Sequence, residues 1–363
     1  MSKFLSSKFS SLTPYTPGEQ PKERKYIKLN TNESPFPPSE SVIKAAADEA
    51  GNVMLYSDPE SRVLTETVAK RYGLNFENVL MTNGSDEILN FAFMAFSDEN
   101  NPIVFPDITY GFYPVFAQLN HIPYETIPLE DDFTIDYKKY CGINKNIVIA
   151  NPNAPTGILM PLSEVEEIVK SNQNNVVIID EAYIDFCEFD GDLLDVNPAS
   201  AVNLLGKYDN LIVTQTFSKS RSLAGARLGF GMASEALIND MNTIKYSTNP
   251  YNVNRMTAAA GTAAILDDEY FMKNCKTIIE IRKYVKAELE AEGFKVLPSS
   301  ANFLFIKADY ISGEELYTEL RKEGILVRHF NTPRLKSYNR VTVGSKEEMD
   351  AFLTAVRKIK NKE

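Results

Sequence analysis

The segment Leu211-Ile-Val-Thr-Gln-Thr-Phe-Ser-Lys-Ser-Arg-Ser-Leu-Ala-Gly-Ala-Arg227 carries the pattern that decides the fold class. It begins as a short apolar run and continues directly into a polar stretch that contains Lys219. A strand that is apolar on both faces is typical of a sheet covered by helices on both sides. In an open sheet of this kind, ligands bind at the carboxyl ends of the strands, which is where Lys219 is expected.

Similar apolar runs precede this segment, and helical patterns separate them. Because strands and helices alternate, we expect an α/β fold with a large, mostly parallel sheet. One of the helices, at 163–171, has Ser163 as a candidate N-cap and Glu166 three residues later, which is the pattern of a capping box. The other apolar runs are 78–82, 102–105, 147–150 and 176–179.

The length and the pattern along the chain predict two domains. A chain of 363 residues is long for one core, at about 150 residues per domain. The turn formers in residues 1–38 predict an extended arm that packs with the smaller domain. We expect the large domain over 39–250 and a smaller α+β domain over 251–363. Within the latter, a long helical region should break near Asp267.

Composition excludes several classes of protein. The net charge of −11, without any basic block, argues against a nucleic-acid partner or an anionic membrane surface. No stretch approaches about 20 apolar residues, so no membrane span is expected. The three cysteines are far apart and have no metal-site spacing, so we expect no metal and a reducing, cytoplasmic location.

Four polar elements follow predicted strands and could carry chemistry. Around Lys219, hydroxyls and an arginine suit a phosphate, and a desolvated lysine beside a cation can act as an amine nucleophile. Taken alone, each element also fits an ordinary turn or helix cap. They are Gly84-Ser85-Asp86, the turn Asn151–Gly157 with Asn153, Asp180 with Tyr183, and Thr216, Ser218, Lys219 and Arg227.

Together and in this order, the four elements resemble those of the fold-type I pyridoxal-phosphate enzymes, the aspartate aminotransferase superfamily. The resemblance covers essentially the whole chain. It implies that Lys219 forms an aldimine with pyridoxal 5'-phosphate and later moves the α-proton of the substrate. It also implies that Asp180 keeps the ring nitrogen protonated and that Tyr183 binds the ring oxygen. The phosphate would lie on Gly84, Ser85, Asp86, Thr216, Ser218 and Arg227.

Three further cofactor contacts are implied by the resemblance. Tyr110 looks like the aromatic residue that stacks on the ring. Tyr56 resembles the tyrosine that reaches the neighbouring subunit's cofactor phosphate, which would make a homodimer necessary for activity. The usual turn of the family has a second asparagine where this chain has Ala154. The contact to the ring oxygen therefore falls to Asn153 or to Tyr183 alone.

Local sequences point to a substrate. Segments 12–15, 29–36, 300–303 and 327–334 resemble the histidinol-phosphate aminotransferases, which exchange an amino group between histidinol phosphate and 2-oxoglutarate in histidine biosynthesis. Two guanidinium groups suit a phosphate dianion better than one carboxylate. The resemblance implies a substrate pocket of Tyr15, Asn32, Arg328 and Arg340.

Other functions share this scaffold. Threonine-phosphate decarboxylases and aromatic amino-acid aminotransferases have similar lengths and motifs, and the former also bind a phosphate. A pyridoxal-binding regulatory module without catalysis is disfavoured by the acidic charge and by the presence of Lys219. The identity of the substrate and the choice between transamination and decarboxylation stay open at this point.

Overall fold

The computed structural model describes residues 2–189, 191 and 195–361. Its largest sheet consists of β2 (Val79–Thr82), β3 (Ile103–Pro106), β4 (Tyr124–Ile127), β5 (Asn146–Ala150), β6 (Val177–Asp180), β7 (Leu211–Thr216) and β8 (Gly229–Ala233). The strand order is β2-β8-β7-β6-β5-β3-β4. Only β8 runs antiparallel to its neighbours, and the remaining pairs are parallel. This mostly parallel sheet confirms the predicted α/β class.

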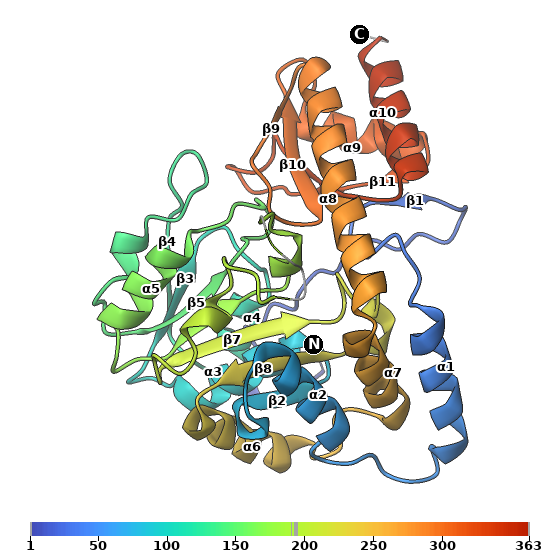
Figure 1. The fold of residues 1–363 in the computed structure, drawn as a ribbon. Helices are drawn as coiled ribbons and strands as arrows, with labels where there is room; N and C mark the ends of the chain where they lie inside the picture. Colours follow the sequence, from blue (N-terminus) through green and yellow to red (C-terminus); the bar gives the residue numbers. More distant parts are fainter. Residues whose placement is uncertain (1, 190, 192–194, 362–363) are drawn as a thin grey trace.

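Helices cover both faces of this sheet (Figure 1). Ile178 and Ile212 face one helix layer, while their neighbours Ile179 and Val213 face the other. The strands are therefore apolar on both sides, as their sequences predicted. The first layer contains α3 (Ser85–Phe96), α4 (Tyr113–Leu119) and α6 (Glu235–Thr248), and the second contains α2 (Arg62–Tyr72), α5 (Leu162–Ser171) and α7 (Arg255–Leu266).

A second, antiparallel sheet lies above the first in Figure 1. Its strands are β9 (Phe294–Val296), β10 (Phe303–Ala308), β12 (Arg328–His329) and β13 (Asn339–Thr342), in the order β12-β13-β10-β9. Apolar side chains of this sheet share one core with three helices. These helices are α8 (Asp268–Ala291), α9 (Gly313–Lys322) and α10 (Lys346–Lys360).

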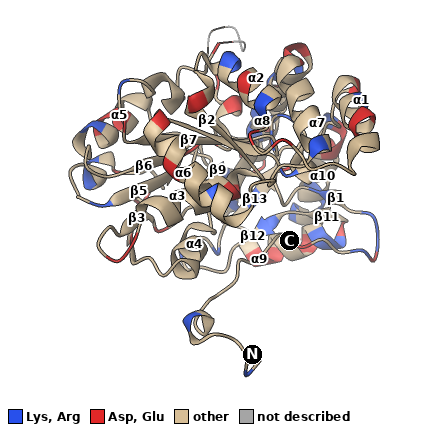
Figure 2. Ribbon diagram, turned by 90° about the horizontal axis from the view of Figure 1, so that it is seen from below, with Lys and Arg blue, Asp and Glu red and all other residues tan. Residues whose placement is uncertain are grey.

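The N-terminal segment joins distant parts of the chain. β1 (Ile27–Lys28) pairs in parallel with β11 (Ile325–Leu326) beside the second sheet. The chain then continues into α1 (Glu40–Glu49), which packs along α7. Figure 2 shows the first residues extending away from the body of the molecule. Single-turn 3-10 helices complete the described structure: η1 (Ser7–Phe9), η2 (Ala50–Asn52), η3 (Phe76–Asn78), η4 (Tyr137–Tyr140), η5 (Ile184–Phe186), η6 (Ala201–Leu204) and η7 (Ala224–Ala226).

Two expectations about helix ends have different outcomes. The predicted break at Asp267 is confirmed, because α7 ends before this residue and its side chain caps α8 through the amide of Tyr270. The predicted capping box at Ser163 is wrong. The helix α5 begins at Leu162, one residue before Ser163, and follows Pro161. Glu166 forms an ion pair with Lys207 and does not bind the backbone at the start of the helix. Proline fixes a backbone angle that suits a helix start without any side-chain cap.

Candidate active site

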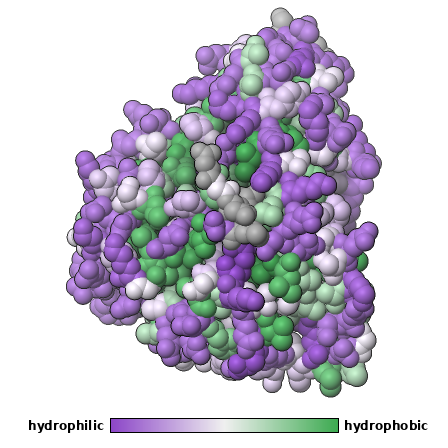
Figure 3. Space-filling view, viewed as in Figure 1, coloured by the Kyte–Doolittle hydropathy of each residue, from purple (hydrophilic) through white to green (hydrophobic). Residues whose placement is uncertain are grey.

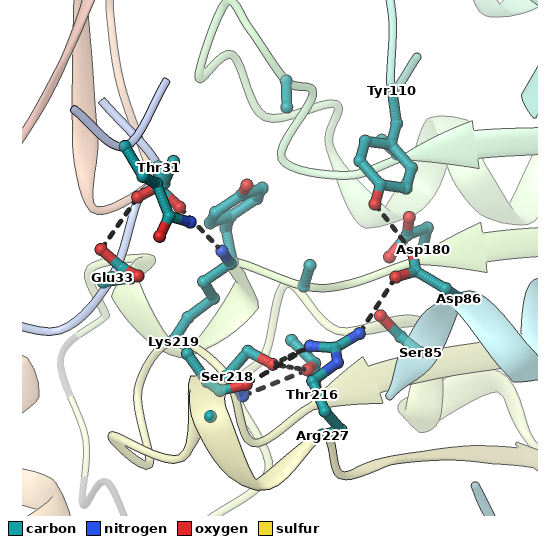
Figure 4. Close-up of a pocket in the computed structure, with 17 residues that line it drawn as sticks. Thr31, Glu33, Ser85, Asp86, Tyr110, Asp180, Thr216, Ser218, Lys219 and Arg227 are labelled. Atoms are coloured by element: carbon teal, nitrogen blue, oxygen red, sulfur yellow. Dashed lines mark hydrogen bonds and ion pairs between the residues drawn. The ribbon is translucent and has the colours of Figure 1, made fainter. Parts of the chain in front are cut away.

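A cavity of about 380 Å³ lies at the carboxyl ends of β5, β6 and β7, beside the first turn of α3 (Figure 4). The strands end level with one another, since Ala150 pairs with Asp180 and Asp180 pairs with Thr214. The structure thus brings most of the predicted cofactor-binding residues to one place. Those that line the cavity are Ser85, Asp86, Tyr110, Asp180, Tyr183, Thr216, Ser218, Lys219 and Arg227.

Lys219 extends from the turn after β7 into this cavity. Its Nζ atom donates a hydrogen bond to the carbonyl oxygen of Thr31, at 3.2 Å. Burial, and after it the nearby Arg340 guanidinium, lowers the pKa of this amine to about 8. An appreciable fraction of the amine is therefore unprotonated near neutral pH, as an amine nucleophile or base requires.

Asp180 is the last residue of β6, and its carboxyl group is buried. The hydroxyl of Tyr113 donates to Oδ2 at 2.9 Å, whereas Oδ1 is buried without a hydrogen-bond partner. Burial raises the pKa of this carboxyl to about 7. A buried acceptor without a partner is unfavourable, so the group fits a ligand that brings a positively charged or N–H donor into the cavity.

Hydroxyl, guanidinium and backbone N–H groups meet at one end of the cavity. Arg227 forms an ion pair with Asp86 at 3.2 Å and lies 3.5 Å from the hydroxyl of Ser218. The helix α3 begins at Ser85, and the first amides of a helix can bind an anion. Gly84, with a φ of 80°, lets the arginine approach, because a Cβ atom there would lie 2.6 Å from Arg227 Nη2. This donor set suits a phosphate group.

Tyr183 also lines this cavity, and Asn32 binds its hydroxyl group. The Asn32 amide donates to the Tyr183 hydroxyl at 2.9 Å. Burial raises the pKa of Tyr183, although Arg340 and the hydrogen bond from Asn32 act in the opposite direction. The phenol is therefore protonated at neutral pH and available to donate to an oxygen of a ligand.

A second cavity of about 720 Å³ adjoins the first and shares Thr31, Tyr110, Tyr183 and Lys219 with it. The residues predicted to bind substrate all line it: Tyr15, Asn32, Arg328 and Arg340. Two guanidinium groups beside a reactive amine make this cavity suitable for an amine substrate with an anionic end.

Hydrogen bonds to the N-terminal segment hold both guanidinium groups in the second cavity. Arg340 donates to the carbonyl oxygen of Asn30 at 3.0 Å, and its Nε atom has no partner. Arg328 donates to the carbonyl oxygens of Thr16 and Pro17, at 3.2 and 3.3 Å. The donors that these contacts leave over can bind an anion.

Comparison with known proteins assigns this architecture to a family. Residues 24–356 match the model of aminotransferase class I and II. The chain belongs to this family. Its relatives include the histidinol-phosphate aminotransferases of Brachyspira hyodysenteriae, 49% identical over 99% of both chains, and of Clostridium acetobutylicum, 46% identical over 98% of this chain and 99% of the relative.

Solved aminotransferase structures share the fold. The histidinol-phosphate aminotransferase of Sinorhizobium meliloti, solved in complex with pyridoxal-5'-phosphate, superimposes with a TM-score of 0.88 at 24% identity, over 99% of this chain and all of the other. An aspartate aminotransferase variant of Thermus thermophilus gives a TM-score of 0.80 at 17% identity, over 99% of this chain and all of the other. The aspartate aminotransferase-like fold expected from the sequence is confirmed.

Three residues that the sequence assigned to the aminotransferase site do not line either cavity: Gly84, which lies against Arg227, and Tyr56 and Asn153. Tyr56 is 80% exposed and stacks on Tyr251, with 4.6 Å between the ring centroids. Asn153 is buried, and its amide donates to the carbonyl oxygen of Ile108 and to the hydroxyl of Thr156 in its own turn, while the neighbouring Ala154 lines the cavity. In this single chain, the structure brings neither Tyr56 nor Asn153 to the other site residues.

Tyr110 does line both cavities. Its hydroxyl donates to Asp86 at 2.7 Å, which holds the ring beside the first turn of α3 (Figure 4).

Sequence reasoning missed several residues of the aminotransferase site. Tyr113 donates a hydrogen bond to Asp180. The only feature of the sequence that could have indicated this role is its position three residues after Tyr110. Thr31 and Glu33 line the first cavity from the N-terminal segment, next to the predicted Asn32. Their approach to Lys219 depends on a contact between residues about 190 positions apart, which no local pattern reveals.

No helix among the described residues is both long and apolar enough to cross a membrane.

Proposed function

We propose that this aminotransferase exchanges an amino group between L-histidinol phosphate and 2-oxoglutarate, giving imidazole-acetol phosphate and L-glutamate in histidine biosynthesis. The observation that carries the proposal is an identity of 44–49% with curated histidinol-phosphate aminotransferases over essentially the full length of both chains. The pair Arg328 and Arg340 beside Lys219 supports it, because one substrate carries a phosphate and the other carries carboxylates.

We propose pyridoxal 5'-phosphate as the cofactor, and the first cavity fits it. The unpartnered Oδ1 atom of Asp180 would accept a hydrogen bond from the protonated pyridine nitrogen. Tyr110 would lie against the ring and Tyr183 would donate to the ring oxygen. The phosphate of the cofactor would be held by Ser85, Asp86, Thr216, Ser218 and Arg227. Gly84 would allow the close approach of Arg227. When bound, the cofactor supplies an aldehyde for amines and a ring that accepts electrons.

The proposed work of the protein is positioning and proton transfer. Lys219 would hold the cofactor covalently and, once displaced by the substrate amine, would take up the α-proton on its Nζ atom. The pKa of about 8 suits this exchange near neutral pH. Asp180 would keep the ring nitrogen protonated through the reaction.

At the substrate end, Arg340 and Arg328 would bind the phosphate of histidinol phosphate, and Tyr15 and Asn32 would complete the pocket. The same two guanidinium groups would bind the distal carboxylate of 2-oxoglutarate or glutamate in the other half-reaction. Their charge explains how one pocket could accept both anions.

We further propose a homodimer in the cytoplasm, with Tyr56 of each chain reaching the cofactor phosphate of the other. Apolar side chains gather at the lower right in Figure 3, over the region of α1, α2 and α7. A groove there is lined partly by Val63 and Leu266, which are 67% and 71% exposed. Tyr56 follows a run of exposed apolar residues, Val53, Met54 and Leu55. A second copy that covers this face would remove a large apolar patch from water.

The test compares half-reactions. The cofactor-loaded chain is mixed separately with histidinol phosphate, phosphothreonine and phenylalanine, and the loss of cofactor absorbance and the release of carbon dioxide are followed. We expect the fastest loss of absorbance with histidinol phosphate, and also a loss with glutamate. Preferential release of carbon dioxide from phosphothreonine would indicate a decarboxylase instead. An unchanged band under glutamate would indicate a regulatory module.

Borohydride reduction followed by peptide mass spectrometry tests the covalent attachment. The adduct should be found at Lys219 and be absent from Lys219→Ala. An adduct at another lysine would contradict the assignment.

A further inference from the structure

A hydrogen-bonded chain of three residues leads away from Lys219 on the side opposite Asp86 and Arg227 (Figure 4). The carbonyl oxygen of Thr31 accepts from Lys219 Nζ, and the Thr31 hydroxyl donates to Glu33 Oε2 at 2.8 Å. The other carboxylate oxygen, Glu33 Oε1, accepts from Lys28 Nζ at 2.8 Å. Thr31 and Glu33 belong to the same segment as Asn32 and line the first cavity, but neither has been assigned a contact to the cofactor or the substrate.

Glu33 lines the first cavity and is only partly exposed. Burial opposes its ionisation, but the hydrogen bonds from Lys28 and Thr31 and the charge of Lys28 outweigh burial, and the pKa of Glu33 lies below its usual value. The group therefore carries a negative charge at neutral pH, in a fixed orientation.

Four charged side chains act on the amine of Lys219. Arg340 and Arg227 oppose a positive charge on its amine, whereas Glu33 and then Asp86 favour one. Asp86 is already bound to Arg227 and to Tyr110. Glu33 is likewise bound to Lys28, but of the two carboxylates it has the larger effect on Lys219. Two further groups lie near Lys219. Its charge lowers the pKa of Asp180, and its Nζ atom lies 5.9 Å from the centre of the Tyr183 ring.

We propose that Glu33 is a positioning residue: its carboxylate, fixed by Lys28 and Thr31, holds the displaced amine of Lys219 against the Thr31 carbonyl and balances the charge of that amine after it has taken up a proton. The inference rests on the proposed role of Lys219 as the base. It predicts that removal of the carboxylate makes the protonated amine less stable, with the fold and the cofactor contacts kept.

The experiment measures Lys219 itself. The full-length chain is saturated with pyridoxamine 5'-phosphate, which leaves Lys219 uncondensed, and is labelled with trace acetic anhydride from pH 6 to pH 10. Peptide mass spectrometry then gives the labelling midpoint of this lysine. We expect Glu33→Gln to lower the midpoint and to raise the labelling rate at pH 7 by roughly threefold or more. Glu167→Gln, which removes an exposed carboxylate paired with Lys170, should leave the midpoint unchanged.

The labelling midpoint shows whether the charge of Glu33 acts on Lys219 or whether Glu33 only supports the fold. An unchanged midpoint in Glu33→Gln with bound cofactor overturns the inference. If that variant fails to fold, Thr31→Val removes one of the two hydrogen bonds that fix Glu33, and a midpoint equal to wild type overturns it as well. Cofactor binding is measured beforehand by absorbance. Its absence in the wild-type chain would count against the proposed function, not against the role of Glu33.

Discussion

Asp180 makes the stability of the cofactor-free chain depend on pH. Its pKa is raised from a usual value near 4 to about 7, so the folded state binds a proton that the unfolded state has lost between these values. Stability from this group therefore falls as pH rises from about 4 to about 7. We predict that Asp180→Asn, which cannot ionise, stabilises the cofactor-free chain by roughly 1–3 kcal/mol more at pH 8 than at pH 5.

Urea unfolding at the two pH values measures this difference. Asp98→Asn provides a control without this dependence, because hydrogen bonds from the amides of Asn100 and Asn101 lower the pKa of Asp98 and keep its titration below pH 5. That variant should change the stability by the same amount at pH 5 and at pH 8. The same gain for Asp180→Asn at both pH values would contradict the raised pKa.

Arg340 is a partly buried cation that lines the substrate cavity. If it pairs with the substrate anion, Arg340→Ala should reduce kcat/KM by an amount equivalent to roughly 2–5 kcal/mol. Steady-state kinetics with histidinol phosphate measures this loss. Arg334 lines the same cavity but binds Asp107 and the carbonyl of Leu129, so Arg334→Ala should change kcat/KM much less. Equal losses in the two variants would remove Arg340 from substrate recognition.

Among single residues, the sequence predicted the position of those that directly follow strands. Lys219 and Asp180 could be placed because the carboxyl ends of parallel strands meet at one edge. The bond from Tyr113 to Asp180 and the approach of Thr31 to Lys219 could not, since they depend on how separate segments pack. The direction in which Asn153 points depends on its turn, so its predicted contact could not be judged from residue type.

Among the elements, the contact between β8 and α3 explains why β8 is rich in glycine. A Cβ atom on Gly229 would lie 2.4 Å from the backbone nitrogen of Ser85, which is impossible without a shift of the helix start. We predict that Gly229→Ala lowers the free energy of unfolding by roughly 1–3 kcal/mol and weakens cofactor binding.

Thermal unfolding and cofactor titration check both effects. Gly51→Ala is the matched control, because nothing lies within 4 Å of a Cβ atom there and the residue lines neither cavity. Equal cofactor affinity in the two variants would show that the first turn of α3 does not hold the phosphate.

The predicted strands were those with continuous apolar runs, and two strands of the sheet escaped this rule. β4 is an edge strand whose residues Tyr124–Ile127 are largely exposed, so it lacks an apolar run. β8 has small residues where α3 approaches.

For the whole molecule, the division into domains at 39–250 and 251–363 stays a prediction. The helix α7 lies after the predicted boundary but packs against α1 and α2 and contributes Ala260 and Ala264 to the core of the large sheet. The antiparallel sheet begins only at Phe294. We propose that any hinge between the two sheets lies near Asp267, between α7 and α8.

The proposed dimer predicts a change in mass and in activity together. Met54 is 77% exposed beside Tyr56, and Met94 is 37% exposed on α3. We expect sedimentation to give twice the chain mass of 40.8 kDa for wild type and for Met94→Glu. Met54→Glu should shift the protein toward a single chain and lower kcat, because a charge would lie in an apolar interface. A dimer of full activity in Met54→Glu would exclude this face.

The pairing of Ile27 with Ile325 has a consequence for synthesis of the protein on the ribosome. The first of these residues leaves the exit tunnel almost 300 codons before its partner. Throughout that interval the N-terminal strand has no edge to join, and Asn32 and Arg340 cannot face each other across the pocket. A nascent chain can thus complete its large sheet early, but it becomes competent for its substrate only as translation ends.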